Sequence, residues 1–273
     1  MKTLIVATDF SKEAENAAEY ACSAAKLMKT KVLLFNSFSI PLHVSNARLP
    51  ASVFKELLEN NTQALKTRAI ELSEKYSVEV EYESSFVQLG DELNTLFTKH
   101  EAKMVIMGTS AHSLDQDLFG NSNTTAILKL RFPVLAIPNG VSFRPIKRIL
   151  YACDVLRGIN VRILNEIKDV AAIMDAEVEI FHVQNNLRKL ESNSNEIVDT
   201  EPITDALEGV SHYYKNIESE TIIDEIKNEI ARINADLLIM VPQRYGFWQS
   251  LTHRSKTRIM ASQSDVPLLS IPI

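Results

Sequence analysis

The chain repeats one pattern of apolar and polar residues, and this duplication limits its fold more than any other feature. The segments that start at Lys2 and Lys147 each read as an apolar strand, an aspartate, a helix and a second strand. The segments that start at Ala102 and Ala235 also match. Three pairs keep one constant offset there: Met107 with Met240, Ser122 with Ser255 and Thr124 with Thr257. We therefore expect two copies of one domain, and 273 residues are enough for each copy to bury its own core.

The boundary between the copies is expected in the segment NGVSFRP. This segment contains a glycine and a proline but neither the helical nor the strand period, which is typical of a linker. The sequence thus predicts domain 1 at residues 1–138, a linker at residues 139–145 and domain 2 at residues 146–273.

Strand-like and helix-like segments alternate along the first copy. Apolar runs predict strands at residues 3–8, 31–35, 79–86, 103–107 and 133–137. Helices are expected after Ser11 as cap, at residues 51–77, at residues 91–102 with Asp91 as a candidate cap, and from about residue 122. This alternation indicates parallel strands joined by right-handed crossovers. Each copy should therefore form a doubly wound α/β domain with a five-stranded parallel sheet.

A ligand crevice in such a sheet lies beyond the carboxyl ends of the strands. Asp9 follows the first predicted strand and Gly108 follows the fourth, at the start of the loop MGTSAHSLDQDLFGNSNTTAI. Glycine lets backbone N–H groups approach a phosphate, and the N-terminus of the following helix attracts anions. The sequence therefore favours a phosphate-binding loop beside the first strand.

The composition excludes several kinds of partner. The net charge is −6, the pI is about 5.6 and no basic block contains aromatic residues, so nucleic acid is not expected to bind. No apolar stretch reaches membrane-spanning length, and acidic residues follow the first apolar run, so neither a membrane partner nor a signal peptide is expected. Cys22 and Cys153 read as buried core residues, and we expect a cytoplasmic protein.

Catalytic residues cannot be assembled from the sequence. The chain has neither a Gly-x-Ser-x-Gly elbow nor a Gly-x-x-x-x-Gly-Lys-Ser/Thr loop. Its six histidines lack the spacing of metal ligands. We therefore expect no catalytic residue and no metal site.

Four short motifs together resemble the universal stress protein family: ATDFS, VIMGTSA, SNT and PVLAIP. The resemblance covers the whole chain as a tandem pair. It implies a five-stranded parallel sheet of the adenine nucleotide alpha hydrolase-like, or HUP, type. Family members commonly dimerise through the last strand. The resemblance therefore implies an internal pseudo-dimer paired through PVLAIP and PLLSIP, with a further homodimer as an extension, because exposed strand edges need a partner.

The resemblance also implies a nucleotide site, because many family members bind ATP through Gly, two residues, Gly, nine residues, Gly and then Ser or Thr. Gly108 and Ser122 fit that pattern, whereas Ala111 and Asn121 replace its other two glycines. Gly120 lies one place early. Asparagine tolerates the left-handed backbone conformation better than most residues, so the loop is weakened rather than destroyed.

Two residues outside the loop complete this predicted site. Asp9 matches the family's aspartate, which contacts the adenosine part, and Ser37 matches a position that makes a backbone contact. The nucleotide-binding residues predicted for domain 1 are Asp9, Ser37, Gly108, Thr109, Ser110, Ala111, Gly120, Asn121, Ser122, Asn123 and Thr124.

The second copy departs further from the family pattern. Val241, Arg244 and Arg254 occupy its three glycine positions. We expect a degenerate site that does not bind ATP in the family manner, although its arginines are suited to another anion. Its residues are Asp154, Val183, Val241, Arg244, Arg254 and Ser255.

The sequence leaves two main functions open. The first is a non-catalytic stress-response module whose domain 1 binds ATP, with Mg²⁺, or a related nucleotide. The second is a nucleotide-independent adaptor or chaperone-like pseudo-dimer that acts through protein partners. In that case the loop is a vestigial turn, and Asp9 and Ser122 only cap helices. A slow ATP hydrolase is a third, less favoured hypothesis.

Overall fold

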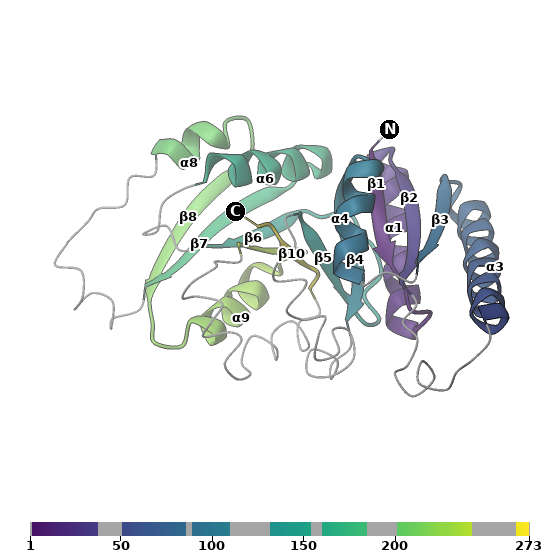
Figure 1. Cartoon of the computed structure of the whole chain (residues 1–273). Coiled ribbons are helices and arrows are strands. Elements are labelled where there is room, and N and C mark those ends of the chain that lie inside the picture. The colour runs from purple at the N-terminus through teal and green to yellow at the C-terminus, as the bar shows by residue number, and fades with distance from the viewer. Residues whose placement is uncertain are drawn as a thin grey trace. The chain divides into compact units, whose positions relative to one another are not determined.

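The computed structural model describes residues 2–37, 51–85, 89–109, 132–153, 160–184, 201–241 and 266–272. The chain forms two compact units, Met1–Phe143 and Arg144–Ile273 (Figure 1). Each unit alternates strands with helices, and each is described by itself below.

The first unit contains a parallel sheet in the order β3-β2-β1-β4-β5. Its elements are β1 (Thr3–Ala7), α1 (Lys12–Met28), β2 (Lys31–Ser37), α3 (Ala51–Tyr76), β3 (Val80–Ser85), α4 (Leu89–Lys99), β4 (Ala102–Thr109) and β5 (Val134–Pro138). The five strands of the sequence prediction are thus confirmed. The predicted helix that begins near residue 122 lies outside the described residues.

The second unit repeats this topology, with the strand order β8-β7-β6-β9-β10. Its elements are β6 (Arg148–Ala152), α6 (Val161–Met174), β7 (Glu177–Gln184), α8 (Glu201–Ala206), β8 (His212–Glu218), α9 (Ile222–Ile233), β9 (Leu237–Met240) and β10 (Leu268–Ser270). The prediction of two doubly wound α/β domains with five-stranded parallel sheets is confirmed.

Both faces of the first sheet are covered at its centre, since every residue of β1 and the five middle residues of β2 are buried. Ile5 and its face-mates Leu33 and Val105 pack in one core cluster with Leu93 and Leu96 of α4. The alternate residues of β1 and β2 face the opposite side, where alanines line the buried face of α1. Continuous apolar runs are the expected signature of strands buried on two sides.

The start of α1 agrees with its sequence signals. Ser11 is the N-cap, and its hydroxyl accepts a hydrogen bond from the Ala14 amide at 3.2 Å. Glu13 and Glu15 lie in the first turn, where carboxylates favour the positive end of the helix dipole. Asp91, by contrast, is not a cap. It lies in the first turn of α4, which begins at Leu89.

The residues after β5 belong to the first unit rather than to a free linker. Asn16 of α1 donates hydrogen bonds to the carbonyls of Pro138 and Val141. The rings of Tyr20 and Phe143 meet edge to face, with centroids 5.2 Å apart. The boundary between the units therefore falls after Phe143.

Among the described helices, none is both long and apolar enough to cross a membrane.

Candidate functional site

The carboxyl ends of β1 and β4 lie side by side in the first unit, because the two strands are neighbours and Ala7 pairs with Met107. Asp9 and Gly108 therefore reach the same edge of the sheet. Gly108 does not follow the fourth strand as predicted, because it lies within β4 and pairs with Ile137 of β5. The strand order reverses at this point, since β2 follows on one side of β1 and β4 on the other. This is where doubly wound sheets bind ligands.

Asp9 is exposed and forms a local turn. Its Oδ1 accepts a hydrogen bond from the Ser11 amide at 3.0 Å. Phe10, between them, has a φ of 64°, in the left-handed region. Asp9 thus shapes the entry to α1 but does not cap it, because Ser11 is the N-cap, and the Asp9 side chain remains accessible at the sheet edge.

Gly108 makes a close approach to the first turn of α1. A Cβ atom at this position would lie 2.8 Å from the Ala14 nitrogen and closer still to the Glu13 carbonyl group. These are backbone atoms, which cannot swing aside as a side chain could. The glycine is therefore required for packing, whatever it does for a ligand.

Thr109 ends β4 inside the sheet. Its side chain is buried, and its hydroxyl donates to the Ile137 carbonyl at 3.2 Å. Its own carbonyl accepts from the Asn139 amide. The expected side-chain donor at this position is thus already used between β4 and β5.

The carboxyl end of β2 carries a buried amide relay that the sequence did not predict. Asn36 Nδ2 donates to the Thr8 carbonyl at 2.6 Å, and Asn61 of α3 donates to Asn36 Oδ1 at 2.9 Å. The neighbouring residue Ser37 is half-buried at the end of β2, level with Ser85 of β3. These hydrogen bonds hold the backbone at Thr8, directly before Asp9.

The second unit makes the same type of bond with a different residue. His182 Nδ1 lies 3.1 Å from the Cys153 carbonyl, and this geometry requires the ring nitrogen to donate. Cys153 and Thr8 also donate their amides to equivalent phenylalanine carbonyls, those of Phe181 and Phe35. The two copies therefore close the carboxyl end of their first strand in the same way.

The two cysteines differ in burial. Cys22 is fully buried in α1, and burial raises the pKa of its thiol to about 12, as expected of a core residue. Cys153 is only half-buried, so its assignment to the core was wrong. It directly follows β6, where the apolar run that suggested burial ends.

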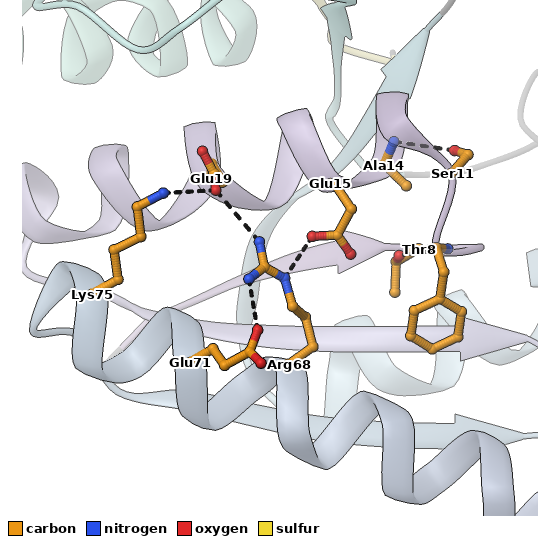
Figure 2. A network of polar contacts seen from close by, with 9 residues as sticks. Thr8, Ser11, Ala14, Glu15, Glu19, Arg68, Glu71 and Lys75 are labelled. Carbon is orange, nitrogen blue, oxygen red and sulfur yellow. Dashed lines mark hydrogen bonds and ion pairs between the residues drawn. The ribbon is translucent and has the colours of Figure 1, made fainter.

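An ion-pair cluster holds α3 against α1 (Figure 2). Arg68 Nε lies 2.5 Å from Glu15 and its other nitrogens contact Glu19 and Glu71, at 3.4 Å and 2.9 Å. Lys75 contacts Glu19 at 2.8 Å. A hydrogen bond from Lys75 lowers the pKa of Glu19. The cluster therefore holds α3 against α1, the helix whose first turn lies next to Asp9 and Gly108.

Most of the predicted phosphate loop lies outside the described residues, as does most of the second copy's site. In domain 1 these residues are Ser110, Ala111, Gly120, Asn121, Ser122, Asn123 and Thr124. In domain 2 they are Asp154, Arg244, Arg254 and Ser255. Val183 and Val241 are described and half-buried, at the ends of β7 and β9. Within the described part of the chain, no group of three His, Cys, Asp or Glu side chains could hold a metal ion.

Comparisons with known proteins agree with this architecture. The family model for the universal stress protein family matches residues 1–138. A universal stress protein from Archaeoglobus fulgidus DSM 4304 has a similar solved structure, with a TM-score of 0.72 and 17% identity over 99% of this chain and 98% of that one.

Two solved structures from Pseudomonas aeruginosa have the same fold over the whole chain. One, a functionally unknown protein from strain PAO1, has a TM-score of 0.55 and 15% identity over 100% of this chain and 92% of that one. The other, a candidate universal stress protein from strain UCBPP-PA14, has a TM-score of 0.53 and 16% identity over 100% and 93%. No curated protein sequence matches the chain.

Proposed function

Because the chain belongs to the universal stress protein family, we propose that it is a non-catalytic stress-response module whose first domain binds ATP or a related nucleotide. The β1–β4 register is the observation that supports this most, since it brings Asp9 and Gly108 to one edge of the sheet. A crevice at a topological switch point is the usual ligand site in such folds. Members of this family are generally not conventional enzymes.

The residues at this edge suit a nucleotide in part. Asp9 is exposed, and a carboxylate there can accept hydrogen bonds from ribose or base donors. Backbone amides after Gly108 would hold the phosphates, with Mg²⁺ balancing their charge. The Thr109 side chain contributes nothing in this proposal, because its hydroxyl donates within the sheet.

The duplication provides a matched pair of variants for the test. Titration calorimetry with ATP, with and without Mg²⁺, should give one site per chain. Asp9→Asn should weaken binding by about tenfold, the usual effect of one hydrogen bond to a charged group. Asp154→Asn, at the equivalent position of the second copy, should leave the affinity unchanged.

Any of three results would contradict the proposal. Equal losses in both variants would place the site elsewhere. Absence of heat and of a thermal shift at millimolar ATP would favour the second function, a nucleotide-independent adaptor acting through protein partners. The packing role of Gly108 is the observation that favours this alternative, because it accounts for the glycine without any ligand. ATP turnover that is lost in the Asp9 variant would instead favour a slow hydrolase.

A further inference from the structure

Two glutamates lie together in the interior of the second unit, where charged side chains are not expected. Glu179 points from the middle of β7 and its side chain is 0% exposed. Glu229 points from α9 and its side chain is 5% exposed. Both belong to the sheet face that α9 covers, among the apolar residues around Phe181 and Ile226. Buried carboxylates are rare unless they are paired or protonated.

The positive charges around the pair are unequally shared. Arg232 Nη2 lies 2.8 Å from Glu179 and 2.5 Å from Glu229, so one nitrogen serves both carboxylates. Glu229 also accepts from Arg232 Nε and from Lys215 Nζ of β8, each at 2.6 Å. Among the residues that the structure describes, Glu179 Oε1 has no hydrogen-bond partner. In the same part of the chain, two cations serve Glu229, whereas Glu179 shares one of them.

The first unit has leucines at the two equivalent positions. Leu33 stands two residues before Phe35 in β2, as Glu179 stands two residues before Phe181 in β7. Leu96 stands six residues before Ala102, as Glu229 does before Ala235. Both leucines are buried in the core of the first unit. The fold thus does not need charge at these two positions.

The surroundings favour one proton on the pair. Burial, followed by the neighbouring Glu229 carboxylate, raises the pKa of Glu179 to about 7. Burial also opposes ionisation of Glu229, but hydrogen bonds from Arg232, Glu179 and Lys215 hold its pKa at about 2. A hydrogen bond from Tyr213 of β8 and the charge of Arg232 lower the pKa of Glu179, but burial and Glu229 outweigh them. The β6 residue level with Glu179, Leu150, is apolar.

We propose that Glu179 and Glu229 form a proton-dependent switch that fastens α9 and β8 to β7 while they share one proton and loosens them when that proton is lost. With the proton, a neutral Glu179 carboxyl faces an ionised Glu229 that two cations neutralise. Without it, two carboxylates compete for one guanidinium nitrogen, and an ionised oxygen of Glu179 stays buried with no hydrogen-bond partner in the described part of the chain. This inference does not depend on nucleotide binding.

The direction of the pH effect follows from linkage. The unfolded chain loses the Glu179 proton at its ordinary pKa of 4.5, whereas the folded unit keeps it up to about pH 7. The contribution of Glu179 to stability therefore falls as the pH rises from about 4.5 to about 7 and does not change further above that. Glu229 acts in the opposite direction only between about pH 2 and 4.5, outside this window.

Hydrogen exchange of the full chain at pH 5.5 and 7.5, corrected for intrinsic rates, tests the switch. Peptides from β8 and α9 should lose protection by about 20-fold at the higher pH, as a folded pKa near 7 requires. Glu179→Gln should show the same protection at both pH values. The double variant Glu179→Leu with Glu229→Leu copies the first unit and should also be insensitive to pH.

Carboxyl NMR of glutamate-labelled protein gives a direct second readout. One glutamate should titrate near neutral pH, and its signal should be missing from Glu179→Gln. The proposal fails if every glutamate titrates below about pH 5.5, the ordinary range. It also fails if protection of β8 and α9 falls equally in the wild type and in both variants.

Discussion

At the scale of single residues, Gly108 illustrates how one signal can have two causes. A glycine after a strand is typical of phosphate loops, because backbone amides must come close to the ligand. The structure supplies a second cause, since β4 passes too close to the Glu13 and Ala14 backbone for any Cβ atom. The sequence could not separate these causes, because both require the same absence of a side chain.

Gly108→Val should therefore destabilise the first unit by about 3 kcal/mol or more, beyond the usual range for overpacking, because only backbone atoms could move aside. Urea unfolding followed by circular dichroism measures this. Gly140→Ala is the control: it has open space but a φ of +79°, so strain alone should cost about 1 kcal/mol.

Equal losses for the two glycine variants would show that the approach of β4 to α1 can relax. The expected inequality has a practical consequence for binding studies. A Gly108 variant that fails to bind ATP says nothing about the phosphate loop, because its fold is already damaged. Asp9 is the better position to change, since its side chain is exposed.

At the scale of elements, the sequence predicted what local pattern determines. Buried apolar runs located the strands of the first unit, and the helical period located α3 within one residue of its observed end. The start of α4 was misplaced because Leu89 and Gly90 already lie in the helix, ahead of Asp91. Helix ends fray, so a boundary taken from sequence is commonly displaced by one or two residues.

Partnerships between elements were beyond the sequence pattern. Arg68 meets Glu15 across 53 residues, and Arg232 meets Glu179 across the same separation. The periodicity of a sequence shows which face of a helix or strand is buried. It does not show which charged residue of another element that face contacts. For the same reason Glu179 escaped notice, because β7 also contains Glu177, His182 and Gln184 and the sequence does not show what each of these side chains faces.

Arg68→Met should loosen α3 from α1 and lower the stability of the first unit by about 1–2 kcal/mol. The estimate is modest because Glu15 and Glu19 are partly exposed and can be rehydrated. Thermal unfolding at low and high salt measures it, and the difference from wild type should shrink in high salt.

Lys55→Met is the matched control on the same helix. Its ion pair with Glu59 is long, at 3.7 Å, and both side chains are mostly exposed. The change should alter stability by no more than about 0.5 kcal/mol. Should Arg68→Met prove as mild as this control, the cluster in Figure 2 does not anchor α3.

At the scale of the whole molecule, the two units share one topology but bury different side chains at equivalent positions. Asn36 and His182 donate to the same carbonyl position, and Leu33 is replaced by Glu179 in the second unit. Parallel pairing and burial on both faces define the fold, so different side chains are tolerated at these positions. The duplication therefore predicted the architecture of the second unit, but it did not predict the ion pairs around Glu179 and Glu229.

The internal pseudo-dimer implied by the family resemblance predicts how the first unit behaves alone. Residues 1–143 should fold by themselves, because their core cluster comes entirely from this segment. β5 is the last strand in the order of this unit's sheet, and an exposed last strand tends to pair with another chain. We therefore expect the isolated unit to form a two-fold dimer through β5 at micromolar concentration.

Light scattering after gel filtration measures the mass of the isolated unit. Ala136→Lys places a charge in β5, at a half-buried position, and should shift the dimer to monomer while circular dichroism stays unchanged. A wild-type unit that remains folded and monomeric at every concentration would exclude pairing through β5. A dimer that survives the lysine would place the contact on another surface. Only loss of the dimer in the variant supports pairing of the isolated first unit through its last strand.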